Sequence, residues 1–155
     1  MNITIAHNIP LLSAIIACII AQGLKPIITK IIHRETQMSY LFTTGGMPSS
    51  HTATTFSLST SIAIISGFDS TIFAVAATLT FIVMHDACNI RYAAGKQAKI
   101  INEWSQILSK IHQDGKFTPE NLKTMLGHTF PQVLVGALLG IFIGICSTYL
   151  LLGKM

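Results

Sequence analysis

Charged residues are scarce in this sequence. Only 10% of its 155 residues are Asp, Glu, Lys or Arg, whereas 50% are hydrophobic, and the mean hydropathy is +0.59. This balance excludes an ordinary soluble domain and is typical of a membrane protein. The first eight residues contain no lysine or arginine, so the basic region of a cleavable signal peptide is missing.

Cysteine is also scarce, and its placement excludes two kinds of site. Cys18, Cys88 and Cys146 are widely spaced and lie in or beside apolar runs. They have neither an even count nor the spacing of metal ligands. We therefore expect small buried hydrophobes, with no disulfide, no metal site and no cofactor.

The sequence does have long apolar runs. They extend from about Ile9 to Ile32, Thr52 to Gly67, Thr71 to Met84 and Val133 to Leu152. A membrane-spanning helix needs roughly 20 apolar residues, and the middle two runs are shorter and rich in Ser and Thr. We expect an all-α integral membrane helical bundle with about four transmembrane helices, plus cytoplasmic amphipathic helices.

The basic residues predict an orientation. If four spans alternate, nine of the ten basic residues lie at the face where segments 33–51 and 85–132 emerge, and Lys154 alone lies elsewhere. The positive-inside rule makes that face cytoplasmic and places both termini outside, in what we expect is a bacterial plasma membrane. The net charge of +4 therefore reflects topology rather than nucleic acid binding, and this face favours anionic lipid headgroups or phosphate.

Residues 94–126 are expected to form a cytoplasmic or interfacial helical insert. From Ala94 to Ile111 apolar residues recur at steps of three and four, which predicts an amphipathic helix. That helix either lies in the membrane interface or packs on protein, including a second subunit. Thr118-Pro119-Glu120 then predicts the start of a short helix that ends at Gly127.

Three glycines in the fourth run predict close helix packing. Gly136, Gly140 and Gly144 recur at four-residue spacing, which lets two membrane helices approach closely. The partner is either another span of the bundle or a second copy in a homo-oligomer.

A glycine-rich loop at residues 45–52, Gly-Gly-Met-Pro-Ser-Ser-His-Thr, is the most distinctive motif. It places Pro48 at the expected first turn of a helix, with Ser49, Ser50 and His51 at the helix mouth. Free N–H groups, the positive end of a helix dipole and a histidine favour an oxyanion such as phosphate. An ordinary capped helix start with a tolerated histidine is equally compatible with the local sequence.

Further ionisable residues adjoin the apolar runs, where charge is costly. Asp86 ends the third run, Arg91 follows five residues later, and His128 precedes the fourth run, all at the same face as His51. Asp86 and Arg91 could instead form a structural ion pair, and lysines near the end of the first run could simply reach the interface. The remaining cationic candidates are Lys25, Lys30, Arg34 and Lys123.

Two histidines among cations suggest phosphoryl transfer through a covalent intermediate. A neutral imidazole can attack phosphorus while a protonated one donates to the leaving oxygen, because imidazole titrates at about pH 6.5. Lysines, arginines and helix N-termini can hold the charged equatorial oxygens. Helix capping by the same histidines is the alternative.

Three ordered motifs carry a family resemblance. They are the Gly-Gly-Met-Pro-Ser-Ser-His segment, Asp86 with Arg91 and Ala-Gly-Lys-Gln-Ala at 94–98, and Leu-Gly-His-Thr at 126–129. From about residue 21 to residue 144 the chain resembles the divergent acid phosphatase/vanadium-dependent haloperoxidase-related family, a distant branch of the type-2 phosphatidic acid phosphatase superfamily. The resemblance implies a single membrane-embedded phosphatase-like domain over residues 1–155.

The resemblance also implies residue roles. His128 would be the nucleophile and His51 the general acid, and Ser49 or Ser50 with backbone amides would cradle the phosphate. The other phosphate-binding positions implied are Lys25 or Lys30 with Arg34, and Arg91 or Lys123 in place of an arginine expected before the nucleophile. Gln132 stands where the superfamily has an aspartate that orients the nucleophile, and we hypothesise that Asp86 takes over this role.

The sequence thus predicts a metal-independent membrane phosphatase. It would hydrolyse a lipid phosphate or pyrophosphate at the cytoplasmic leaflet through a phosphohistidine at His128. The alternative, favoured by Gln132, is a non-catalytic membrane protein that binds or transports an anionic phospholipid or polyprenyl phosphate through the same pocket.

Overall fold

The fold is all-α, as the sequence predicts. A computed structural model describes residues 7–33, 45–111, 121–124 and 126–154, and these ranges contain no strand. The helices are α1 (Ile9–His33), α2 (Ser50–Ser66), α3 (Thr71–His85), α4 (Arg91–Ile111) and α5 (Phe130–Leu152), with a π-helix, Asp86–Ile90, between α3 and α4.

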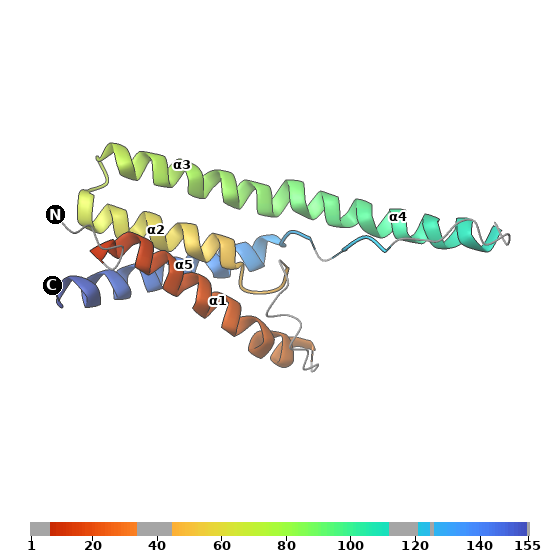
Figure 1. Cartoon of the computed structure of the whole chain (residues 1–155), viewed down its shortest axis with the longest axis horizontal. Coiled ribbons are helices and arrows are strands. Elements are labelled where there is room, and N and C mark those ends of the chain that lie inside the picture. The colour runs from red at the N-terminus through yellow and green to blue at the C-terminus, as the bar shows by residue number, and fades with distance from the viewer. Residues whose placement is uncertain (1–6, 34–44, 112–120, 125, 155) are drawn as a thin grey trace.

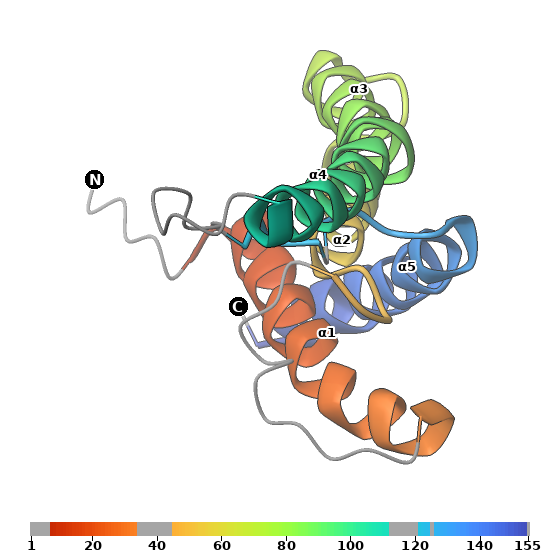
Figure 2. The same ribbon diagram turned by 90° about the vertical axis from the view of Figure 1, so that its right-hand side faces the viewer.

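The centre of the bundle is α2, which packs against α1, α3 and α5 (Figures 1 and 2). Its interior face is small and polar, and hydroxyls replace large apolar side chains there. Ser13 of α1 shares a 2.7 Å hydrogen bond with Ser57 of α2 and accepts another, also 2.7 Å, from Ser147 of α5. Such bonds hold apolar helices together where lipid offers no hydrophobic driving force between them.

The glycines of α5 contact α2 of the same chain. A Cβ at Gly136 would lie 2.6 Å from the Ser49 carbonyl oxygen, and one at Gly144 would lie 2.8 Å from Thr60 Cβ. Gly140 faces Ala53 equally closely. These glycines therefore pack against another span of the bundle, which is one of the two alternatives that the sequence leaves open; a homo-oligomer stays a prediction.

Three helical stretches in the described part of the chain are long and apolar enough to cross a membrane: Ile9–Ile31, Thr71–Ile111 and Phe130–Leu152. The second predicted span, α2, has 17 residues and is about 26 Å long. The first residues of α1 and the last of α5 lie at one end of the bundle, so the four helices alternate in direction (Figure 1). All three cysteines are free, but Cys18 and Cys146 are exposed on the outer surface rather than buried as expected.

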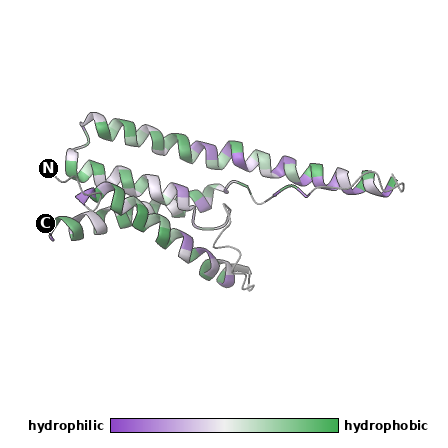
Figure 3. Ribbon diagram, viewed as in Figure 1, coloured by the Kyte–Doolittle hydropathy of each residue, from purple (hydrophilic) through white to green (hydrophobic). Residues whose placement is uncertain are grey.

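The third run and the amphipathic helix form one continuous rod of 41 residues (Figure 1). At 1.5 Å per residue it is about 62 Å long, roughly twice the bilayer's hydrocarbon thickness. Its α4 half, more hydrophilic in Figure 3, continues along the axis of α3. A helix collinear with a membrane span does not lie flat in the interface, but α4 also leaves Trp104, Ile107 and Leu108 exposed, so the choice between the two alternatives stays open.

The short helix expected to end at Gly127 is absent from residues 121–124 and 126–127; its expected start, 118–120, lies outside the described residues. Asn102 on α4 explains the difference. Its side chain accepts from the Leu122 N–H and donates to the Leu122 carbonyl, each at 2.9 Å. These bonds take the place of a helical ladder and hold the segment extended along α4.

Candidate active site at one end of the bundle

The loop before α2 is fixed to the start of α5. Ser49 is the N-cap of α2, and its buried Oγ accepts from the Thr52 N–H at 3.4 Å and from Thr52 Oγ1 at 2.9 Å. The Ser49 N–H donates to the Gln132 carbonyl at 3.1 Å. Pro48 therefore precedes the cap instead of standing in the first helical turn as expected, because the helix begins only at Ser50.

His128 is held by its backbone and by its neighbouring glycine. Its N–H donates to the Ala87 carbonyl in the π-helix at 3.0 Å. Gly127 has φ +76, and a Cβ there would overlap the backbone of Arg91 and Tyr92. Only glycine fits this close approach with a left-handed φ. A π-helix is frequently found at a functional site, and here it supplies the carbonyl that anchors His128.

A small cavity of about 70 Å³ is lined by four of the predicted site residues. About 10–15 Å³ of this kind of space is enough for one water, so the cavity has room for a small tetrahedral anion. Its lining combines residues from the start of α2, the end of α3, the π-helix and the loop before α5. These residues are His51, Val83, Asp86, Ala87, Arg91 and His128.

The His128 imidazole is 3% exposed, and neither ring nitrogen has a hydrogen-bond partner in the described part of the chain. Burial lowers its pKa below the usual 6.5, and the positive charge of Lys25 lowers it further. The Gln132 side chain and the Gly46 backbone lie near enough to the ring to raise its pKa, although neither meets hydrogen-bond geometry, and burial and Lys25 outweigh them. The ring is therefore neutral at neutral pH, with a lone pair available on a nitrogen.

Lys25 is the basic residue of α1 that reaches the site. Its side chain is fully buried. Its positive charge lies close enough to His51 and His128 to affect both imidazoles electrostatically. The helix continues through Pro26 to His33, and Lys30 further along it is exposed. Of the expected pair, the structure thus favours Lys25 over Lys30, whereas Arg34 lies outside the described residues.

Asp86 and Arg91 form an ion pair, which is one of the two alternatives that the sequence leaves open. The Arg91 N–H also donates to the Asp86 carbonyl, which is the five-residue bond of a π-helix. Asp86 lines the cavity beside His128 but makes no hydrogen bond to it in the described part of the chain. The proposed orienting role of Asp86 therefore remains a prediction without a direct contact.

The predicted residues Ser50 and Lys123 do not line the cavity. Ser50 is buried in the first turn of α2, and Lys123 is exposed on the extended segment. Gln132 Oε1 accepts from the Thr129 N–H at 3.0 Å, so this side chain caps α5. Sequence reasoning did not assign Gly95, where a Cβ would lie 2.8 Å from the Leu126 carbonyl oxygen. The signal was present, because a glycine inside an amphipathic helix usually has a packing reason.

Together, the fold and the cavity define an integral membrane helical protein with histidines and cations gathered at one end of its bundle. A sequence model described as the "Divergent PAP2 family" matches residues 6–143. The chain belongs to the Divergent PAP2 family, which confirms the resemblance seen in its motifs. It is 39% identical over 150 residues to the uncharacterized membrane protein YuiD of Bacillus subtilis (strain 168), a match covering 92% of this chain and 95% of YuiD. No solved structure matches the chain.

Proposed function

We propose that the protein is a membrane phosphatase that hydrolyses a lipid phosphate or pyrophosphate through a phosphohistidine. One observation carries the proposal. A buried histidine with two unpartnered ring nitrogens, His128, lines a small cavity together with His51 and Arg91. A buried polar group without a partner is costly, so a ligand that completes its bonding is the natural explanation.

The first chemical step uses His128 as nucleophile. A neutral ring nitrogen attacks phosphorus, a phosphorus–nitrogen bond forms, and the bond to the lipid oxygen breaks. Protonated His51 donates its proton to that leaving oxygen. Arg91 and buried Lys25 supply positive charge for the equatorial oxygens, whose charge must be held in the transition state.

The second step returns the enzyme to its starting state. Water attacks the phosphohistidine, neutral His51 accepts the water's proton, and inorganic phosphate leaves as the phosphorus–nitrogen bond breaks. The candidates for the cradle are the N-terminal backbone amides of α2, Ser50 and the Ser49 O–H, because Ser49 Oγ only accepts in its two capping bonds. Lys30, Arg34 and Lys123 remain predicted phosphate ligands.

A second function is favoured by Gln132. Its amide cannot stabilise an imidazolium by charge, and its oxygen already caps α5. A protein with the same pocket but no turnover would bind or transport an anionic phospholipid or polyprenyl phosphate.

For either function we propose that the site faces the cytoplasm and that both termini lie outside. The support is the gathering of basic residues at the end of the bundle that holds the cavity. Cysteine-accessibility labelling of a variant with cysteine at exposed Lys123 or at Lys154 tests this orientation in intact cells.

Phosphate release from the purified full-length chain in nanodiscs tests the enzyme. The substrates are lipid phosphates and pyrophosphates of varied chain type. We expect release that His128→Ala abolishes and that His85→Ala, a change at an exposed histidine outside the small cavity, leaves intact. Saturable lipid phosphate binding without release from any substrate would favour the binding protein.

A further inference from the structure

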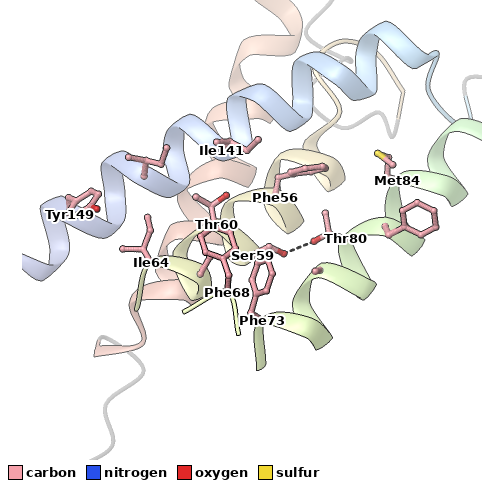
Figure 4. A pocket seen from close by; sticks show the side chains of 14 residues that line it. Phe56, Ser59, Thr60, Ile64, Phe68, Phe73, Thr80, Met84, Ile141 and Tyr149 are labelled. Atoms are coloured by element: carbon pink, nitrogen blue, oxygen red, sulfur yellow. Dashed lines mark hydrogen bonds between the residues drawn. The ribbon is translucent and has the colours of Figure 1, made fainter. Parts of the chain in front are cut away.

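A long apolar groove lies in the membrane-embedded part of the bundle. Its volume is about 650 Å³, within the roughly 300–1,000 Å³ usual for ligand sites. α3 and α5 each pack on α2 but make little contact with each other, so α2 forms the floor and the other two helices form the walls. Figure 4 shows side chains from all three helices directed into this space.

The side chains that line the groove are mostly apolar. On α3 it follows one helical face, from Phe73 through Ala77 to Met84, and on α5 it follows Ile141, Ile145 and Tyr149. Two hydroxyls in the wall are already bonded. Ser59 and Thr80 share a 2.7 Å hydrogen bond, and Thr80 also donates to backbone carbonyls. The groove thus offers mainly hydrocarbon surface, because phenylalanine, alanine and isoleucine make up most of its lining.

The groove runs toward the small histidine cavity. Val83 lines the cavity and its neighbour Met84 lines the groove; on α2, His51 lines the cavity and Phe56 lines the groove about 7.5 Å further along the helix axis. Between Met84 and Phe73 the groove follows about 16 Å of α3, roughly half of the hydrocarbon thickness. Phe68 and Phe73, in an edge-to-face contact with centroids 5.0 Å apart, lie at its far end.

We infer that this groove holds one hydrocarbon chain of the lipid whose phosphate occupies the histidine cavity. The inference rests on the proposed phosphate site. It adds a binding site for the hydrocarbon part of the substrate, which the phosphate site does not contact. A single-chain amphiphile with a terminal phosphate, either linear or isoprenoid, matches an apolar groove that ends beside an anion pocket. Its headgroup would enter from the basic end while its chain lies between α3 and α5.

Photo-crosslinking tests occupancy without requiring turnover. The probes are a linear alkyl phosphate and an isoprenyl phosphate, each with a diazirine midway along the chain, and the same two chains as alcohols. The full-length protein in nanodiscs is irradiated and the labelled peptides are mapped. We expect label on groove residues of α2, α3 or α5 from at least one phosphate probe, with less from its alcohol. The ratio of linear to isoprenoid labelling identifies the chain type.

Two substitutions on α3 provide a matched pair. Ala77→Trp fills the groove, whereas Val75→Trp places the same side chain at an exposed position outside it. We expect Ala77→Trp to lower groove labelling by about tenfold, Val75→Trp to leave it unchanged, and Arg91→Ala to lower phosphate-probe labelling only. Equal labelling by phosphates and alcohols would show bulk lipid in the groove, and no labelling of groove residues by any probe would show that the groove holds no such chain; either result overturns the inference.

The two proposals fail separately. Groove labelling without phosphate release would leave the tail site standing and remove the phosphatase. Release from a short-chain phosphate without groove labelling by any long-chain probe would leave the phosphatase standing and remove the tail site.

Discussion

The backbone N–H of His128 donates a hydrogen bond to the carbonyl of Ala87, 3.0 Å away. This bond joins the loop before α5 to the π-helix between α3 and α4. It places the candidate nucleophile beside Arg91 without using the imidazole, so both ring nitrogens stay available for a ligand. The position of His128 therefore depends on backbone geometry, and Gly127 controls that geometry.

Gly127→Ala is expected to displace His128. A Cβ at this position would overlap the Arg91 and Tyr92 backbone, and a left-handed conformation costs a non-glycine residue about 1–2 kcal/mol. We expect phosphate release and vanadate binding to be lost while the protein still inserts into membranes. Gly23→Ala is the control, because a Cβ there meets nothing within 4 Å. Equal activity of the two variants would contradict the proposed role of Gly127.

The stability of the protein should fall at mildly acidic pH because of His128. Its folded pKa is below 6.5, so the unfolded chain binds the proton first as pH falls. The contribution of His128 to the free energy of unfolding is therefore complete above about pH 6.5 and is lost as pH falls through the folded pKa. Thermal unfolding in one detergent, from about pH 8 to about pH 5, measures this dependence.

His128→Gln should flatten that pH profile, whereas His85→Gln, which removes an exposed histidine, should leave it unchanged. Parallel profiles for the wild type and His128→Gln would show that His128 does not titrate as inferred.

Asp86→Asn separates the two roles considered for Asp86. Because the carboxylate pairs with Arg91 and makes no hydrogen bond to His128, we expect the variant to change substrate affinity by a few-fold and kcat by about twofold at most. Steady-state kinetics over a range of substrate concentrations give both quantities. A kcat as low as that of His128→Ala would instead establish Asp86 as the residue that orients the nucleophile.

Gly140→Val tests the close packing of the α5 glycines against α2. A Cβ there would overlap Ala53 and lie 2.9 Å from Phe56 Cβ, so we expect a loss of about 1–3 kcal/mol in folding stability. Leu138→Val, at an exposed position of the same helix, should cost far less. Light scattering should give the same oligomeric state for the wild type and for Gly140→Val. A change of oligomeric state without loss of stability would favour the oligomer interpretation of these glycines.

Much of the fold could be predicted because apolar composition dictates where helices cross a bilayer. The first, third and fourth runs became α1, α3 and α5, with ends close to those expected. The fusion of α3 with α4 was missed because the polar residues after Met84 resemble a loop. The sequence from His85 to Ala94 nevertheless contains no Gly or Pro to stop a helix. The extended chain at residues 121–124 depends on Asn102, a long-range contact that no local pattern reveals.

The candidate site was predictable in its residue types but not in its contacts. The motifs identified His51, His128 and Arg91, and the structure brings these three to one cavity. Spacing alone could not choose between Lys25 and Lys30, because the choice depends on how α1 packs. The use of Ser49 and Gln132 as helix caps follows from where α2 and α5 begin, which periodicity places only within a few residues.

Trapping of the covalent intermediate tests the central claim most directly. Wild-type protein in nanodiscs is mixed with a lipid phosphate carrying labelled phosphorus, quenched in alkali, where phosphohistidine survives, and digested for mass spectrometry. The proposed mechanism predicts one phosphorylated peptide containing His128, absent in His128→Ala and accumulating in His51→Ala when the leaving group needs no proton. Phosphate release with the label on another residue, or with no labelled protein at any time, would contradict it.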